Sequence, residues 1–203
     1  MARRDQDRGL LIKVVSEWWA PPDRDRGTRW TAPDYGPCVR ELWSATLPAL
    51  PGSDVNRLLE AIPGDCQSLA GEYERLFVGP AAPSCPPYES LWRTDRPVHE
   101  QGMVMGECTQ DVTALYGGIG LRRRPGEREL ADHIAIEMEA LACAFGVQAG
   151  ATATLLLAHL QMWVRPFCAQ VRRQSRLPFY QALADLTPAL IGELAPCGSP
   201  ETA

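Results

Sequence analysis

The sequence lacks an apolar run long enough to cross a membrane. No segment approaches the roughly 18 apolar residues that a spanning helix needs. The chain opens with a twin-arginine pair, Arg3 and Arg4, of the kind that begins some bacterial export signals. The run that follows, Leu10 to Val15, is short and interrupted by Lys13, so it does not supply the apolar part of such a signal. We therefore expect a cytoplasmic protein without stable membrane insertion.

Positive charge is also scarce. The formal net charge is −5 and the isoelectric point is about 5.3. Proteins that bind nucleic acid need a basic surface to neutralise phosphates, and none dominates here. We expect no nucleic-acid partner, whereas an acidic protein suits a cationic one.

The seven cysteines form no paired motif. No CxxC pair and no Cys/His cluster at zinc spacing occurs, which favours separate reduced thiols in the cytoplasm. Glycine-rich phosphate loops of the Walker or dinucleotide type are absent as well. We expect no cofactor and no metal. The cysteines are Cys38, Cys66, Cys85, Cys108, Cys143, Cys168 and Cys197.

No stretch alternates with a period of two for long enough to predict a strand, so the predicted class is all-α. A chain of 203 residues with 45% hydrophobic residues can bury one sizeable core. We predict a single compact domain, residues 1–203, of about eight to ten helices, with a loose tail over 196–203. Apolar spacing predicts helices near 10–19, 35–47, 53–62, 69–78, 103–116, 129–147 and 152–163, and a last pair within 179–194.

Several boundaries carry their own signals. The stretch 23–33 is charged and predicts a loop, and Ser53 predicts a helix cap. Pro166 should kink or restart its helix. The run Arg122 to Arg124, with Pro125 and Gly126, predicts a loop that is either solvated or an anion patch.

The stretch from Glu72 to Trp92 organises the prediction of function. Its first part places an apolar stripe at helical spacing, and Gly79 with Pro80 should end that helix. Three prolines then stiffen a loop that presents Tyr88, Glu89 and Trp92. An ordinary proline-rich connection would look the same when taken alone. The stripe is Leu69, Tyr73, Leu76 and Phe77, and the prolines are Pro83, Pro86 and Pro87.

A second candidate site lies between residues 129 and 137. Glu129, His133 and Glu137 are spaced i, i+4, i+8 on one expected helix, which a metal could use. A di-iron bundle repeats such ligands on several helices, and no second copy occurs. Asp132 and His133 could equally cap the helix or form a buried pair.

Four segments in order carry a family resemblance. GEYERLFVGP, PPYESLW, ADHIAIEMEA and AHLQMWVRPF follow one another between Glu72 and Phe167. Together they resemble the TorD/DmsD family of molybdoenzyme maturation chaperones, the redox enzyme maturation proteins. The match through PPYESLW points to the branch that serves periplasmic DMSO-reductase-like enzymes. In the N-terminal third, the chain matches only in helical character.

The resemblance implies a cytoplasmic, all-helical chaperone that is not an enzyme. Such a protein binds the twin-arginine signal peptide of a molybdopterin oxidoreductase precursor, holds it back from export and assists cofactor insertion. Carboxylates would take the arginines and aromatic rings would cover the apolar run. The implied peptide-binding residues are Tyr73, Leu76, Phe77, Pro86, Pro87, Tyr88, Glu89, Trp92, Asp132, His133, Glu137 and Glu139.

The chain departs from the family at one place. Where relatives commonly read ELEFM, it reads Glu137 to Leu141 as EMEAL, so an aromatic contact is lost and the client's apolar run should pack differently. Relatives also form domain-swapped dimers, so both monomer and swapped dimer stay open. Two other functions compete: an accessory subunit kept in the oxidoreductase complex, and a helical metalloenzyme using Glu129, His133 and Glu137.

Overall fold

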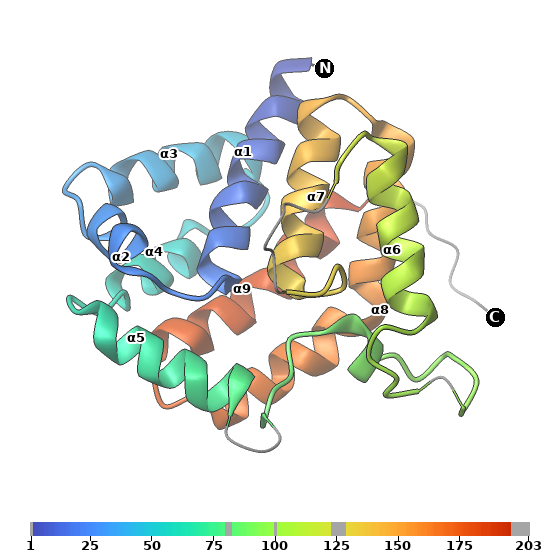
Figure 1. Ribbon diagram of the computed structural model, residues 1–203. Coiled ribbons are helices and arrows are strands. Elements are labelled where there is room, and N and C mark those ends of the chain that lie inside the picture. Colours follow the sequence, from blue (N-terminus) through green and yellow to red (C-terminus); the bar gives the residue numbers. More distant parts are fainter. Residues whose placement is uncertain (1, 80–82, 100, 123–128, 196–203) are drawn as a thin grey trace.

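The described chain folds into helices and loops. The computed structural model describes residues 2–79, 83–99, 101–122 and 129–195 (Figure 1). The predicted all-α class with eight to ten helices is confirmed, since nine α-helices and no strand lie within these ranges. The α-helices are α1 (Ala2–Trp19), α2 (Arg24–Trp30), α3 (Tyr35–Thr46), α4 (Gly52–Glu60), α5 (Cys66–Tyr73), α6 (Glu107–Gly118), α7 (Ile134–Gly146), α8 (Gly150–Gln174) and α9 (Pro178–Leu194). A π-helix, η1 (Glu74–Val78), and a 3₁₀ turn, η2 (Glu89–Leu91), complete the order.

Two predicted features lie outside the described residues. These are most of the arginine-rich loop, at 123–128, and the tail at 196–203. No helix in the described ranges is long and apolar enough to span a lipid bilayer.

The charged stretch 23–33 is not a loop throughout, so that prediction is wrong. It contains α2, which begins after Asp23, whose carboxylate accepts a hydrogen bond from the Arg26 amide at 2.8 Å. This is a standard aspartate cap. Trp30 at the other end is 4% exposed and fixes the short helix to the core.

Other helix ends also differ from prediction. Ser53 lies inside α4, which begins after Pro51, so it is not the cap. The last two helices are continuous: α8 runs through Pro166, and α9 through Pro188 as one helix instead of a pair. Pro166 is exposed, so the carbonyl that loses its amide partner lies on the solvent side.

The two helices nearest the candidate site begin later than predicted. α6 starts at Glu107 instead of Met103, and α7 starts at Ile134 instead of Glu129. Glu129, His133 and Glu137 therefore do not share one helix face, because only Glu137 belongs to α7. The earlier helix ends as predicted at Gly79, whose φ of 60° suits glycine.

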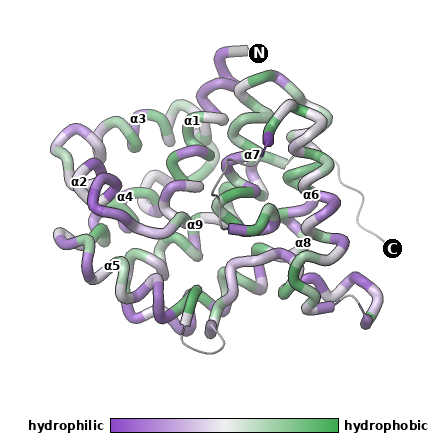
Figure 2. The backbone as a smooth tube through the Cα atoms, viewed as in Figure 1, coloured by the Kyte–Doolittle hydropathy of each residue, from purple (hydrophilic) through white to green (hydrophobic). Residues whose placement is uncertain are grey.

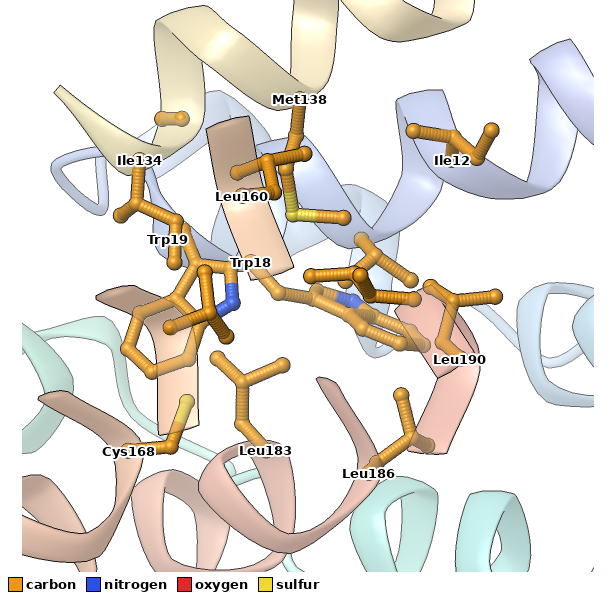
Figure 3. Packing of buried hydrophobic residues seen from close by; sticks show 14 of the residues in the cluster. Ile12, Trp18, Trp19, Ile134, Met138, Leu160, Cys168, Leu183, Leu186 and Leu190 are labelled. Carbon is orange, nitrogen blue, oxygen red and sulfur yellow. The ribbon is translucent and has the colours of Figure 1, made fainter. Parts of the chain in front are cut away.

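The core centres on α1, which packs along α7 with α8 and α9 behind (Figure 1). Trp18 and Trp19 are almost wholly buried and lie between Met138 of α7 and Leu183 and Leu186 of α9 (Figure 3). Both indoles are satisfied: Trp18 donates to the Tyr35 hydroxyl at 2.9 Å and Trp19 to the Thr187 hydroxyl at 3.0 Å. Along the tube, α7 is mostly apolar, as a helix buried on nearly all sides must be (Figure 2).

Candidate functional site

Two segments far apart in the sequence pair through their backbones. Residues 86–93, which we call the strap, run antiparallel to residues 130–134, with an isolated bridge between Tyr88 and His133. The Ile134 amide donates to the Pro87 carbonyl and the Glu89 amide to the Asp132 carbonyl, both at 2.9 Å. The strap and the start of α7 are therefore held in one fixed register.

Side chains hold the strap at both ends. The Tyr88 hydroxyl donates to Glu129 at 2.8 Å, and the Trp92 indole donates to the Pro86 carbonyl at 2.6 Å. The Trp92 ring also meets Phe167 of α8 edge-on, with centroids 5.7 Å apart. These contacts place the strap against the core, and the rigidity that the prolines predict stays a prediction.

Ionisable side chains of the strap and of the helices it covers form a cluster, which we call the polar cluster. The Glu89 carboxylate accepts a hydrogen bond from Arg93 and lies 3.1 Å from Nδ1 of His159. Arg93 also holds Asp95 with two hydrogen bonds, at 2.5 and 2.6 Å. These carboxylates raise the pKa of Arg93 despite its burial. The members are Glu89, Arg93, Asp132, His133, Glu137 and His159.

Glu137 is fully buried. Within the described residues neither of its carboxyl oxygens has a partner, nor has Oδ1 of Asp132. The other Asp132 oxygen accepts from the Ser90 amide at 3.2 Å. Burial, reinforced by the charges of Glu89 and Asp132, raises the pKa of Glu137 well above its usual 4.5. Burial therefore favours the protonated, neutral form of Glu137.

His133 is the cap of α7. Its Nδ1 accepts a hydrogen bond from the Ala135 amide at 3.1 Å, and its Nε2 lies 3.4 Å from the Tyr73 hydroxyl. Burial lowers the pKa of His133 to about 3, so the ring is neutral. Because Nδ1 accepts, the proton must sit on Nε2 and point to Tyr73. The prediction that His133 caps the helix is confirmed, whereas the side-chain contact of this buried ring is to Tyr73 and not to Asp132.

Aromatic rings form the apolar side of the site. Tyr73 and Phe77 lie 4.9 Å apart between centroids, and Phe77 meets Tyr180 at 5.5 Å. Leu76 is fully buried beside them. The π-helix that carries Leu76 and Phe77 is a conformation often found at functional sites.

The structure brings most of the predicted site residues together, but it buries them. Tyr73, Leu76, Phe77, Pro87, Glu89, Asp132, His133 and Glu137 are buried, while Pro86, Tyr88 and Trp92 are half-buried. Glu139 lies apart from the polar cluster and pairs with Lys13 of α1 at 2.5 Å. The predicted carboxylate groove is therefore covered in this structure, and the peptide-binding set stays a prediction.

Sequence reasoning missed three members of this site. Arg93 follows Glu89 by four residues, the spacing at which a helical turn pairs opposite charges, and that signal was present. His159 and Trp163 lie within the AHLQMWVRPF segment but had no predicted role. The Trp163 indole lies near Glu137 and lowers the pKa of that carboxyl in part.

The predicted metal alternative finds no support in this geometry. Glu129 is bonded by Tyr88, and His133 uses Nδ1 for its cap. Across the described ranges, no three Cys, His, Asp or Glu side chains lie close enough to hold a metal ion.

Comparisons with known proteins agree on one family. The family model described as "Nitrate reductase delta subunit" matches residues 48–169. The chain is 32% identical over 123 residues to the chaperone protein TorD of Shewanella pealeana, covering 59% of this chain and 55% of that protein. It is 31% identical over 126 residues to TorD of Shewanella piezotolerans, covering 61% and 59%. The chain thus matches between half and two thirds of the length of these relatives.

A solved structure shares the fold. The crystal structure of an inferred redox enzyme maturation protein from Archaeoglobus fulgidus superposes with a TM-score of 0.59 at 22% identity. The superposition covers 91% of this chain and 93% of that one.

Proposed function

Since this chain belongs to the TorD/DmsD family of redox enzyme maturation chaperones, we propose that it binds the precursor of a molybdopterin oxidoreductase in the cytoplasm. The recognised element is the precursor's twin-arginine signal peptide. Binding holds the precursor back from export while its cofactor is inserted. The chain itself performs no catalytic step and carries no cofactor. It acts as a monomer or a domain-swapped dimer.

One observation carries this proposal. The four segments that mark the family meet at the polar cluster. Glu89 comes from the second segment, His133 and Glu137 from the third and His159 from the fourth, while Tyr73 of the first segment contacts His133. A buried meeting point of polar side chains from four separate segments indicates a shared role for them. Stability alone is a poor one, because buried carboxylates without partners destabilise a core.

The chemistry suits a guanidinium ligand. An arginine side chain offers five N–H donors in a planar fork, and carboxylates accept them in pairs. Asp132 and Glu137 have acceptor oxygens without partners within the described residues. Ser90 and Glu89 cover them, so the proposal requires the strap to move aside before an arginine enters. Proton release from Glu137 would accompany entry of the positive charge.

Calorimetric titration with synthetic peptides tests this proposal. The probe carries Arg-Arg ahead of an apolar run of about 12 residues, and the matched control carries Lys-Lys instead. We expect the Arg-Arg peptide to bind at least about tenfold more tightly, because lysine cannot donate bidentately. Equal affinity for both peptides would contradict arginine recognition.

Isosteric variants then test the polar cluster. Glu137→Gln and Asp132→Asn keep the buried shapes while removing the carboxylates, so loss of fold does not confuse the result. We expect each to weaken Arg-Arg binding by about tenfold or more. Glu60→Gln, on the exposed face of α4, is the matched control. Unchanged affinity in both cluster variants would remove the proposed acidic role.

A second function has one observation in its favour. The matched family is described by the name of a subunit, which favours an accessory subunit that stays with the oxidoreductase. The polar cluster would then border a permanent interface. Finding the chain in the exported, mature enzyme would favour this reading, whereas association with the precursor alone favours the chaperone.

A further inference from the structure

Exposed apolar side chains concentrate in two segments. Nine large hydrophobic side chains are exposed among the described residues, and six of them lie in the loop before α6 or on α8. The other three, Leu10, Val78 and Val147, are scattered. We call the six residues the methionine surface: Val98, Met103, Val104, Met105, Leu155 and Met162.

The two segments border the same element, η2. The Gly102 amide donates to the Ser90 carbonyl at 3.2 Å, which fixes the loop to η2. His159 of α8 contacts Glu89, the neighbouring residue of η2, at 3.1 Å. The loop also leads into α6, which packs against α8 (Figure 1). Both segments that carry the methionine surface therefore border η2, within the strap.

The exposed side of α8 has the pattern of a helix-binding seam. Ala151, Leu155, Ala158 and Met162 are all exposed and follow one another at i, i+4, i+7 and i+11. This spacing keeps side chains on one stripe, and small residues between large ones leave room for a partner's side chains. Between Gly150 and Val164, α8 has no Asp, Glu, Lys or Arg. Solvated helix faces normally carry charge, so this one suits an apolar partner.

The loop before α6 is built from adaptable side chains on a constrained backbone. Met105 has a φ of 64°, a left-handed conformation that non-glycine residues seldom adopt. Strained positions of this kind cluster at functional sites. Methionine side chains are flexible and polarisable, so they can repack around apolar partners of different shape.

The edge of the methionine surface is acidic. Asp95 is paired with Arg93, so the carboxylates left at this edge are Glu107 and Asp111, which share one guanidinium, that of Arg96. Arg96 bonds Asp111 and lies 3.6 Å from Glu107, which remains 60% exposed. A cationic segment preceding an apolar helix would find complementary charge here.

We propose that the methionine surface binds the apolar run of the client's signal peptide as a helix. This inference rests on the proposed function and deepens it. The arginine pair enters the polar cluster, the apolar run continues past η2 along α8, and other positive charge before the run faces Glu107 and Asp111. The polar cluster thus binds the arginine pair of the signal peptide, whereas the methionine surface binds its apolar run.

Paired serine variants test the surface. Leu155→Ser with Met162→Ser replaces two side chains that are 51% and 49% exposed. The control, Leu10→Ser with Val147→Ser, replaces two that are 59% and 63% exposed on other elements. The same titration uses the Arg-Arg peptide and a second peptide whose apolar run is replaced by glycine and serine. Circular dichroism and melting confirm that each variant is folded.

We expect the α8 pair to weaken binding of the Arg-Arg peptide by about tenfold or more, while the control pair binds like the wild type. The peptide without its apolar run should bind wild type and α8 pair equally. If the α8 pair binds the Arg-Arg peptide like the wild type, the surface assignment is wrong and the proposed function stands. If the wild type does not prefer Arg-Arg over Lys-Lys, the proposed function itself fails.

A second copy of the chain is the competing occupant. Sedimentation of the wild type and the α8 pair distinguishes it. A wild-type dimer that the α8 pair converts to monomer, without a change in peptide affinity, would overturn our assignment. If the wild type and the α8 pair sediment with the same mass and the α8 pair binds the peptide more weakly, the result supports our assignment.

Discussion

Two neighbouring buried groups, Glu137 and His133, have pKa values shifted in opposite directions. Burial raises the pKa of Glu137 well above 4.5 and lowers that of His133 to about 3. The two shifts have the same cause, because desolvation disfavours the charged form of each group. Their effects on stability have opposite dependence on pH.

For Glu137, the folded protein holds a proton that the unfolded chain releases above pH 4.5. The free energy of unfolding therefore falls as pH rises from 4.5 towards the raised folded pKa, at up to about 1.4 kcal/mol per pH unit. Glu137→Gln removes this dependence. Urea unfolding from pH 4 to 9 should show the variant gaining stability relative to the wild type as pH rises. A difference that stays constant with pH would show that Glu137 is not neutral in the fold.

For His133, the sign is reversed. The unfolded chain takes up a proton below pH 6.5, which the folded protein resists until about pH 3. Stability is therefore lost as pH falls through this window, again at up to about 1.4 kcal/mol per pH unit. His133→Asn keeps a side chain that can cap α7 but cannot titrate. We expect the free energy of unfolding of the variant to rise relative to that of the wild type only below pH 6.5. The same series of urea unfolding experiments measures it.

Residue types at the site could be predicted, but their exposure could not. The motif residues Glu89, Asp132 and Glu137 indicate an acidic site, and the structure gathers them. Local sequence does not show that the strap lies on top of them, because that depends on backbone pairing between Tyr88 and His133, far apart in the chain. Glu139 looks equivalent to Glu137 in sequence, yet it lies with Lys13 of α1.

At the scale of elements, the contact between α1 and α7 depends on one glycine. A Cβ on Gly9 would lie 2.9 Å from the Ala142 carbonyl oxygen, which is backbone and cannot move alone. Gly9→Ala should therefore destabilise the protein by on the order of 1–2 kcal/mol, despite the better helix propensity of alanine. Chemical denaturation measures the free energy of unfolding.

Gly71 is the matched control for that substitution. It lies in α5, and a Cβ there meets nothing within 4 Å. Gly71→Ala should stabilise the protein by about 0.5–1 kcal/mol, since only the propensity term remains. Equal effects of the two substitutions would contradict the close packing of α1 on α7.

Helix existence followed from apolar spacing, whereas helix starts did not. The range predicted near 35–47 agrees with α3 because its apolar stripe spans the element. α7 starts five residues later than its stripe indicates, because residues 129–133 pair with the strap and His133 acts as the cap. α8 continues through Pro166 because the proline lies on an exposed face. Tertiary contacts override local signals at each of these points.

For the whole molecule, the order of the motifs along the chain predicted the family, which no single motif could do alone. Each of the four segments is short and could occur by chance, but their sequence along one helical chain identifies the family that residues 48–169 match. The fold brings these segments together, since three of them contribute residues to the polar cluster and Tyr73 of the first contacts His133 there. The methionine surface belongs to none of the quoted motifs except through Met162, so only the folded arrangement reveals it.

We propose above all that the chain recognises an unexported oxidoreductase precursor. The most direct measurement is capture of the tagged chain from the cytoplasm of its own host, grown by anaerobic respiration, with bound proteins identified by mass spectrometry. We expect to recover one molybdopterin oxidoreductase subunit with its signal peptide intact. Recovery of mature subunits alone, or of no partner even after crosslinking, would contradict it.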